Sequence, residues 1–342
     1  MVKLLRITLY PFALLYGAIT KLRNWAFDFG IFKSTSFDIP LVEVGNLNVG
    51  GTGKSPQIEY IIRLLQNKYK IAVLSRGYKR KSKGFQMASE KTTVEQIGDE
   101  PLQFYRKFKN IVVAVDADRV NGINQLINIA SPPQIILLDD AFQHRNVKAG
   151  LNILLTSYNK LYADDYMLPT GDLRENRSGA KRAHIIVVSK CPENISTKEQ
   201  DIIIEKLKPT KTQTVFFSAI KYDDRVLSGT KEISVSKLHE FEVLLVTGIA
   251  NPEPLLNFLR DKNIKFNHLK YPDHYNFSER DLKNVFFEFE KIKNQNKIIL
   301  TTEKDYVRAF SKDNNKVYYL PIRTDILGSD SDFNKMILDY VQ

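Results

Sequence analysis

Apolar and polar positions alternate along most of the chain as they do in parallel α/β proteins. After residue 38, short apolar runs are separated by longer stretches whose apolar residues recur with helical spacing. Because parallel strands are usually joined by crossover helices, this pattern predicts a mostly parallel sheet with flanking helices. The predicted strands are Leu41–Val44, Ile71–Ser75, Ile111–Val115, Ile135–Asp139, Leu151–Leu155 and Ile185–Val188, and the predicted helices are Ser55–Gln66, Glu100–Phe108 and Arg119–Asn128.

A second pattern of the same kind occupies the C-terminal third of the chain. The segment before it, Phe216–Val235, consists of short extended pieces around a Ser-Gly turn. The predicted elements after it are strands at Val243–Thr247, Phe266–Lys270, Ile298–Thr302 and Val317–Leu320 and helices at Glu253–Asp261, Glu279–Lys291 and Asp332–Tyr340. We therefore predict an N-terminal helix in residues 1–30, a larger α/β domain in 31–222, an extended linker in 223–238 and a smaller α/β domain in 239–342.

The N-terminal segment raises the question of a membrane. Residues 1–27 contain no acidic residue, and the uncharged run Leu9–Ile19 is shorter than the roughly 20 apolar residues needed to span a bilayer. The basic residues of the segment are Lys3, Arg6, Lys21 and Arg23. A helix in the membrane interface is the favoured interpretation. A helix packed on its own domain and a cleaved signal peptide stay open, although no A-x-A-like cleavage site follows.

Composition excludes some classes of protein. Hydrophobic residues make up 43% and charged residues 26% of the 342 residues, which excludes a largely disordered chain. The single cysteine, Cys191, excludes an internal disulfide framework and a cysteine-rich zinc site. The net charge of +11 indicates an anionic partner, which can be nucleic acid, an anionic membrane or a phosphorylated substrate.

The stretch LVEVGNLNVGGTGKS, residues 41–55, is the most informative in the chain. An apolar strand runs into a glycine-rich turn, and Lys54 and Ser55 open a helix, which is the context of a Walker A phosphate loop. The loop predicts a bound nucleoside triphosphate, with Lys54 on the β- and γ-phosphates and the Ser55 hydroxyl on Mg²⁺. The predicted nucleotide-binding residues are Asn48, Val49, Gly50, Gly51, Thr52, Gly53, Lys54 and Ser55.

Two further features bear on this loop. The strict motif has glycine where this chain has Asn48, and we expect asparagine to preserve the loop because it tolerates a left-handed backbone. The predicted strand at Ile135 ends in Asp139 and Asp140, and such an acidic strand end holds Mg²⁺ in P-loop enzymes. A glycine-rich turn without a ligand is the alternative to a phosphate loop.

Other short motifs follow the predicted strands in a specific order. They are SRGYKR at 75–80, GDEP at 98–101, Asp118-Arg119, DDAFQH at 139–144, LPTGDLRE at 168–175, GIANP at 248–252, DHYNF at 273–277 and TEKD at 302–305. Together with VGNLNVGGTGKSP, this series resembles the tetraacyldisaccharide 4'-kinase family, the lipid A 4'-kinases of Gram-negative bacteria. The resemblance extends from the apolar N-terminus to about residue 308.

The resemblance implies a P-loop kinase that uses ATP and Mg²⁺. The family transfers the γ-phosphate to the 4'-hydroxyl of an acylated disaccharide 1-phosphate at the cytoplasmic face of the inner membrane. It implies Asp99 as the catalytic base, His274 as the residue that orients it, and Lys54 as a stabiliser of the transferring phosphoryl group. The implied metal residues are Ser55, Glu100, Asp139 and Asp140, and the implied substrate-binding residues are Arg76, Arg80, Arg119, Arg174 and Glu175.

The residues alone leave other interpretations open. Asp99 could cap a helix that begins at Pro101, Glu100 could be a first-turn acid, and His274 could be an ordinary loop histidine. The charged residues Arg119, Arg174 and Glu175 could form exposed surface salt bridges.

Three residues that differ from the family pattern and one basic segment also bear on the predicted site. Ala141, Thr170 and Asp172 depart from the usual family pattern, and Asp172 adds a charge near the predicted site. Residues 70–91 carry seven basic side chains against one acidic, which favours a face for the substrate's 1-phosphate and the bilayer over a solvated loop.

The competing functions are another P-loop small-molecule kinase, a GTPase and a nucleic-acid-associated ATPase. The chain has no N-K-x-D motif for guanine, and its basic residues gather beside an apolar segment. We therefore expect the acylated lipid and the membrane surface as partners, with no nucleic acid and no obligate protein partner.

Overall fold

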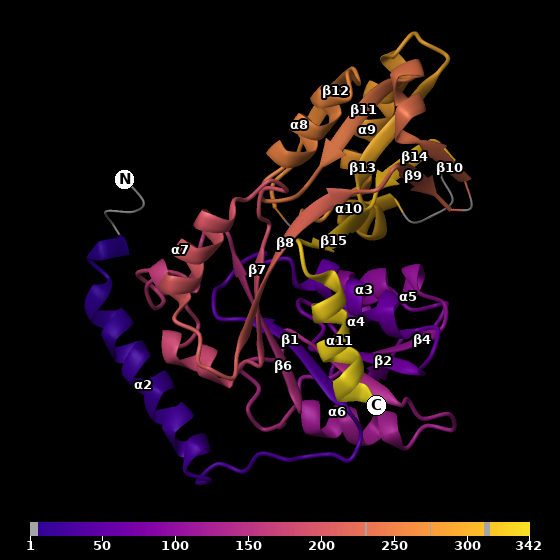
Figure 1. Ribbon diagram of the computed structural model, residues 1–342. Helices are drawn as coiled ribbons and strands as arrows, with labels where there is room; N and C mark the ends of the chain where they lie inside the picture. Colours follow the sequence, from indigo (N-terminus) through magenta and orange to yellow (C-terminus); the bar gives the residue numbers. More distant parts are fainter. Residues whose placement is uncertain (1–5, 230, 274, 311–314) are drawn as a thin grey trace. The chain divides into compact units, whose positions relative to one another are not determined.

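The computed structural model describes residues 6–229, 231–273, 275–310 and 315–342, which form two compact units (Figure 1). Unit 1 comprises the chain up to residue 220 together with residues 324–342, and unit 2 comprises residues 221–323. The chain passes between the units twice, within strand β8 (Thr214–Tyr222) and within strand β15 (Ile322–Ile326).

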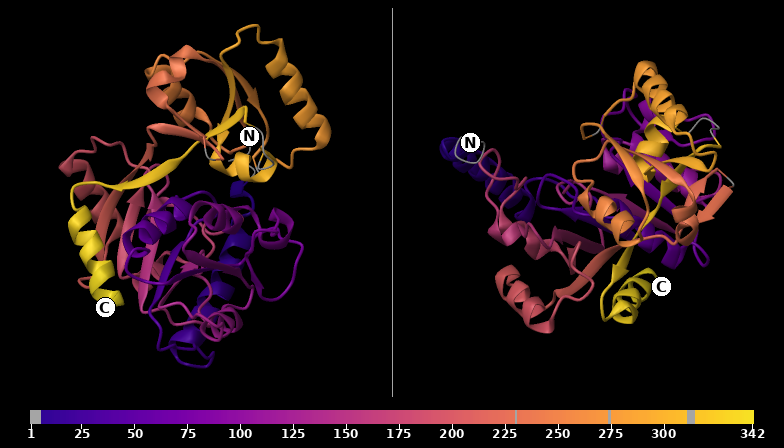
Figure 2. Two further views of the ribbon diagram at one scale, coloured as in Figure 1. Left: turned by 90° about the vertical axis from the view of Figure 1, so that its right-hand side faces the viewer. Right: turned by 90° about the horizontal axis from the view of Figure 1, so that it is seen from above.

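This division differs from the predicted domains at two places. Residues 324–342, which were expected in the smaller domain, return to unit 1 as helix α11 (Asp330–Val341; Figures 1 and 2). Phe333 and Ile337 of this helix lie in the core of unit 1. Residues 223–238, which were expected to be a linker, supply strands β9 (Arg225–Ser228) and β10 (Lys231–Ser234) to the sheet of unit 2.

Unit 1 is built on a nine-stranded sheet with the order β15-β8-β7-β6-β1-β5-β2-β4-β3. Its other strands are β1 (Leu41–Asn46), β2 (Ile71–Ser75), β3 (Gln86–Met87), β4 (Ile111–Val115), β5 (Ile135–Asp139), β6 (Leu151–Ser157) and β7 (Ile185–Ser189). The strands from β8 through β4 pair in parallel, and the short β3 runs antiparallel to β4. The predicted parallel sheet is confirmed, with strand limits within two residues of those expected.

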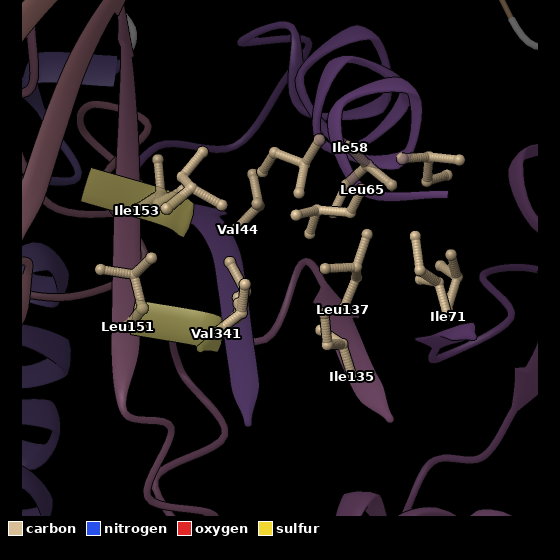
Figure 3. Packing of buried hydrophobic residues seen from close by; sticks show 14 of the residues in the cluster. Val44, Ile58, Leu65, Ile71, Ile135, Leu137, Leu151, Ile153 and Val341 are labelled. Atoms are coloured by element: carbon tan, nitrogen blue, oxygen red, sulfur yellow. The ribbon is translucent and has the colours of Figure 1, made fainter. Parts of the chain in front are cut away.

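Helices cover both faces of this sheet. On one face, α3 (Lys54–Leu65) buries Ile58, Ile61 and Leu65 in the core that also contains Val44 of β1. Figure 3 shows Ile58 and Leu65 beside Val44. Because these apolar residues recur at helical spacing, they form one continuous stripe toward the sheet. The remaining α-helices between α3 and β8 are α4 (Val94–Ile97), α5 (Asp99–Lys107), α6 (Arg119–Ile127), which packs on the opposite face, and α7 (Thr197–Leu207).

Helix α2 (Tyr10–Asp28) differs from α3 because its large apolar side chains point away from the rest of unit 1. The residues that point toward the rest of unit 1 are small, polar or near the helix end: Ala13, Tyr16, Thr20, Asn24 and Phe27. The exposed face carries the large apolar side chains Phe12, Leu15, Ile19, Leu22 and Phe29. No helix among the described residues is long and apolar enough to cross a membrane.

Unit 2 has a six-stranded sheet with the order β10-β9-β14-β13-β11-β12. The remaining strands are β11 (Glu242–Thr247), β12 (Phe266–Lys270), β13 (Lys297–Thr302) and β14 (Val317–Leu320). Helix α8 (Glu253–Asp261) packs on one face and α9 (Glu279–Lys291) on the other, and a short α10 (Glu303–Asp305) follows β13. The smaller α/β unit is therefore present, although its limits differ from those predicted.

Candidate active site

The loops that carry chemistry in unit 1 follow the carboxyl ends of four parallel strands. β1 ends at Asn46, β2 at Ser75, β5 at Asp139 and β7 at Ser189. The strand order places all four ends along one edge of the sheet. Ligands of open parallel sheets bind outside the carboxyl ends of the strands, so the candidate site lies at this edge.

The phosphate loop connects β1 to α3. Gly50 and Gly53 have φ angles of 113° and 83°, which side chains other than glycine rarely adopt. Gly53 is the N-cap of α3, and no side chain caps the helix. The first turn of α3 therefore presents its backbone N–H groups and the positive end of its dipole to a ligand rather than to a capping residue.

Asn48 supports this loop in a different way from the one expected. Its backbone is not among those with positive φ, so the loop does not use the tolerance of asparagine for a left-handed backbone. Its side-chain amide donates to Asp165 Oδ2 at 2.7 Å, and its backbone carbonyl oxygen accepts from Asn46 Nδ2 at 2.8 Å. Asn48 thus ties the start of the loop to the segment that precedes the LPTGDLRE motif.

Lys54 and Ser55 reach two different acidic neighbours. The Lys54 ammonium lies 3.3 Å from Asn46 Oδ1 and 3.7 Å from Asp140 Oδ2. The Ser55 hydroxyl donates to Glu100 Oε1 at 3.0 Å, which links the loop to the first turn of α5. The lysine, the serine and the acids of two motifs therefore meet at the N-terminus of α3.

Asp139 is the buried member of the acidic pair. One carboxylate oxygen accepts a hydrogen bond from Ser75 Oγ at 2.8 Å, and the other has no partner among the described residues although it is buried. Burial raises the pKa of Asp139, and the nearby Glu100 and Asp140 raise it further. A cation at this carboxylate would relieve both effects.

Asp140, the next residue, has the opposite electrostatic character. Arg174 donates to both of its carboxylate oxygens, at 2.8 and 3.3 Å. Burial acts to raise the pKa of Asp140, but Lys54 and Arg174 outweigh burial and hold its pKa below the ordinary value. Its φ of 47° is unusual for a residue other than glycine and places its side chain toward these two cations.

These acids fit a hard divalent cation such as Mg²⁺. The orphaned oxygen of Asp139, the carboxylates of Asp140 and Glu100 and the Ser55 hydroxyl are oxygen ligands of the type that Mg²⁺ prefers. Among the described residues, no three His, Cys, Asp or Glu side chains form a ready-made metal cluster.

Comparisons with known proteins decide which P-loop family this is. The profile of the family described as Tetraacyldisaccharide-1-P 4'-kinase matches residues 5–342. The chain belongs to this kinase family. A tetraacyldisaccharide 4'-kinase of Flavobacterium johnsoniae is 53% identical over 99% of this chain and 98% of its own length. The corresponding protein of Bacteroides thetaiotaomicron is 43% identical over 98% and 93%.

A solved structure has the same fold. A crystal structure of LpxK from Aquifex aeolicus in complex with ATP matches 99% of this chain and 100% of its own, with a TM-score of 0.79 and 29% sequence identity. The predicted family and the predicted P-loop α/β fold are therefore confirmed. Among the P-loop alternatives, the comparisons favour the lipid kinase over a GTPase or a nucleic-acid-associated ATPase.

Glu175 lies deeper in this kinase fold than a substrate-binding or surface residue would. Its side chain is 3% exposed, and its oxygens accept hydrogen bonds from Arg182 at 2.8 and 2.9 Å, Gln143 at 2.9 Å and Asn24 at 2.9 Å. Glu175 therefore ties α2 to Gln143 and Arg182, and its contact with substrate stays a prediction.

The other three arginines that were predicted to bind substrate differ in whether their side chains are bound within the protein or exposed. Arg119 is 2% exposed and donates to the carbonyl oxygens of Asp116 and Asp139, and burial lowers its pKa to about 10. Arg80 donates to the carbonyl of Gly84 at 2.8 Å. Both therefore support the backbone rather than extending toward a substrate, whereas Arg76 is exposed.

Asp99 is the first residue of α5, and its Oδ1 accepts from the backbone N–H of Glu100 at 3.1 Å. The N-cap of α5 is Gly98, with φ of 91°, so the interpretation of Asp99 as the cap of a helix beginning at Pro101 is wrong. His274 lies outside the described residues. Its pairing with Asp99 stays a prediction.

Sequence reasoning missed three residues that contact the phosphate loop or its lysine. Lys190, which directly follows β7, donates to the carbonyl of Gly51 at 2.5 Å, and Ser189 Oγ donates to the carbonyl of Thr52 at 2.7 Å. Asn46 accepts from Lys54 and Arg174 through its side chain. Their position after parallel strands could have revealed them. Polar residues at the ends of β2 and β5 were recognised in the sequence, whereas those at the ends of β1 and β7 were not.

Proposed function

We propose that this chain transfers the γ-phosphate of ATP to the 4'-hydroxyl of a tetraacyldisaccharide 1-phosphate. The observation that carries the proposal is the meeting of Lys54 with the Asp139-Asp140 pair at the N-terminus of α3, in a chain whose family carries this name. A phosphate loop facing two acids with opposite pKa shifts suits phosphoryl transfer, which depends on positioning and charge stabilisation.

Each residue has a defined part in the proposed reaction. The backbone N–H groups of residues 48–55 hold the phosphates, and Lys54 stabilises the negative charge on the transferring phosphoryl group. Ser55, Glu100, Asp139 and Asp140 would hold Mg²⁺, which when bound neutralises phosphate charge. Asp99 accepts the proton of the attacking hydroxyl as the oxygen–phosphorus bond forms and ADP leaves.

His274 in the proposed mechanism orients Asp99 and makes it a better base. Arg174 keeps Asp140 ionised through its bidentate contact and so preserves an anionic site for the cation. Arg76 is available for the substrate because it is exposed, whereas Arg80, Arg119 and Glu175 act through the backbone and side chains that they contact.

We place the protein at the cytoplasmic face of the inner membrane of a Gram-negative bacterium, with α2 in the lipid interface. The apolar stripe formed by Phe12, Leu15, Ile19, Leu22 and Phe29 supports this, because each of these side chains is at least half exposed. The acylated acceptor is the partner in this proposal, and neither nucleic acid nor a second protein is needed.

The test is a mixed-micelle assay with labelled ATP and a tetraacyldisaccharide 1-phosphate. We expect Lys54→Ala to lower the rate of lipid labelling by about 10²–10³-fold, because it removes a charge that stabilises the transition state. Lys68→Ala is the matched control, since Lys68 is an exposed lysine just beyond α3. ATP hydrolysis that requires Lys54 without any labelled lipid would rule out the acceptor while keeping the phosphate loop.

A further inference from the structure

A shallow cavity of about 630 Å³, wide open at the surface, lies in unit 1 where the chain leaves the end of α2. It is lined by Arg23, Phe27, Ile31, Phe32, Lys33 and Asn146. None of these residues belongs to the phosphate loop or the acidic cluster. The lining combines cations with aromatic and aliphatic side chains.

The cavity has an excess of positive charge. The guanidinium groups of Arg23 and Arg145 each lie 5.1 Å from the centre of the Phe27 ring. Arg145 is neutralised by Asp28 at 2.6 Å, whereas Lys33 is exposed and forms no ion pair with any residue that the structure describes. Three cations against one carboxylate give a local charge of +2, which suits a phosphate monoester.

The apolar part of the cavity continues onto the exposed face of α2. Phe27 and Phe32 pack edge to face with ring centres 5.3 Å apart. Ile31 is 60% exposed, and Phe29 and Trp25 stack beside it along the chain with ring centres 4.8 Å apart. A ligand here would meet cations at one end and an apolar surface at the other, as a phosphorylated amphiphile requires.

A short series of hydrogen bonds connects this cavity to the phosphate loop. Arg23 donates to the carbonyl oxygen of Gln143 at 3.1 Å, and the Gln143 side chain donates to the carbonyl oxygen of Asn46 at 2.9 Å. Asn46 in turn accepts from Lys54. Gln143 and Asn46 are therefore the only two residues in the series between Arg23 and Lys54, so the cavity and the phosphate loop are held by one set of contacts.

We propose that this cavity binds the 1-phosphate of the acceptor, with Arg23 and Lys33 on the phosphate and Phe27 and Phe32 beside the attached acyl chains. The inference rests on the proposed function, in which the other end of the same disaccharide presents its 4'-hydroxyl near Lys54.

This assignment replaces the one expected for the basic segment 70–91. In that segment Arg80 is bound to backbone carbonyls and Lys81 pairs with Glu95 at 2.6 Å. Its charges are therefore partly satisfied within the protein. The cavity beside α2 combines its excess charge with the apolar surface that an acylated phosphate also needs.

The test measures acceptor binding through Trp25, the single tryptophan of the chain, which lies on α2. The titrants are the tetraacyldisaccharide with and without its 1-phosphate, in micelles of a neutral detergent. We expect wild type to prefer the phosphorylated lipid by about tenfold or more. In Arg23→Gln with Lys33→Gln, that preference should disappear, while the dephosphorylated lipid binds as it does to wild type.

The control variant Lys68→Gln with Lys211→Gln removes the same net charge from exposed positions elsewhere and should keep the full preference. Lys33→Gln alone should reduce the preference, and it removes a side chain that forms no ion pair among the described residues. A preference that survives in the double variant, or equal weakening for both lipids, would overturn the assignment. Because binding is read without turnover, loss of the proposed kinase activity would appear separately, as unlabelled lipid in the micelle assay.

Discussion

Helices α2 and α3 belong to the same unit and both carry an apolar stripe, but the stripes face opposite environments. In α3, the side chains of Ile58 and Ile61 are fully buried against the sheet. In α2, Leu15 and Leu22 are 61% and 65% exposed. An apolar stripe in a sequence therefore predicts that something covers it, but does not say whether the cover is protein or lipid.

The reason lies in what α2 contacts. The Tyr16 hydroxyl donates to the carbonyl of Arg174 at 2.9 Å, and Asn24 donates to Glu175 at 2.9 Å. Arg6, which precedes α2, pairs with Asp172 at 3.0 Å, so this departure from the family pattern is bound to the segment before the helix. The surface under α2 is polar because it carries the LPTGDLRE motif of the active site, and the apolar face of the helix must turn outward.

The largest effect in this comparison is expected from the exposed stripe. Changing Ile19 and Leu22 together to Gln should weaken binding to vesicles of phosphatidylethanolamine and phosphatidylglycerol by about 10²-fold, because burying each apolar side chain is worth about 1.5–3 kcal/mol. Vesicle sedimentation measures the binding. The melting temperature should stay within about 1 °C of wild type, since neither side chain is packed on protein.

Tyr16→Phe is the control for this variant because it alters the inner face of α2 and leaves the stripe intact. It should bind vesicles as wild type does. If the double glutamine variant instead melted several degrees lower with unchanged vesicle binding, the stripe would be covered by protein and α2 would resemble α3.

An effect on stability alone is expected from α3. Ile61→Ala should lower the free energy of unfolding by about 2–5 kcal/mol, because it removes fully buried methyl groups and leaves a cavity against the sheet. Urea unfolding measures the loss, with Ile19→Ala on α2 as its matched control. Equal destabilisation by the two variants would contradict the difference between the helices.

Much of the fold could be predicted from patterns within short stretches of the sequence. The parallel strands of unit 1 and the phosphate loop could be predicted because each depends on near neighbours in sequence, such as the apolar run before Gly50 and the helix after Ser55. The return of residues 324–342 to unit 1 could not, because it depends on Phe333 packing against Phe216, more than a hundred residues away. No local pattern encodes that contact.

The residues of the candidate site also fall into those that could be predicted from the sequence and those that could not. Lys54, Ser55, Asp139 and Asp140 were recognisable because motif spacing places them at the ends of neighbouring strands. The burial of Glu175 was not, because it depends on side chains contributed by distant segments. Residue type indicated the chemistry, and only tertiary contacts separated groups available to a ligand from groups that hold the site together.

The smallest effect is expected on the melting temperature, from Asp139 near the N-terminus of α3. It separates the two helices because it changes stability and leaves α2 unaltered. The pKa of Asp139 is raised in the folded state, so the folded chain binds more protons than the unfolded chain, and stability falls as pH rises through that pKa. Asp139→Asn removes this loss. Its melting temperature relative to wild type should rise by a few degrees between about pH 5 and pH 8, measured without nucleotide or metal.

Asp140→Asn provides the control of opposite sign. The pKa of Asp140 is held low by Lys54 and Arg174, so its carboxylate contributes stability at all pH values well above its ordinary pKa. Removing that charge should lower the melting temperature by a similar amount across the whole interval from about pH 5 to pH 8. Parallel curves for wild type and Asp139→Asn would show that Asp139 is not destabilised by its neighbours. Vesicle binding should be the same in all three proteins, because the acids act on the α3 side of unit 1 and the lipid-facing stripe belongs to α2.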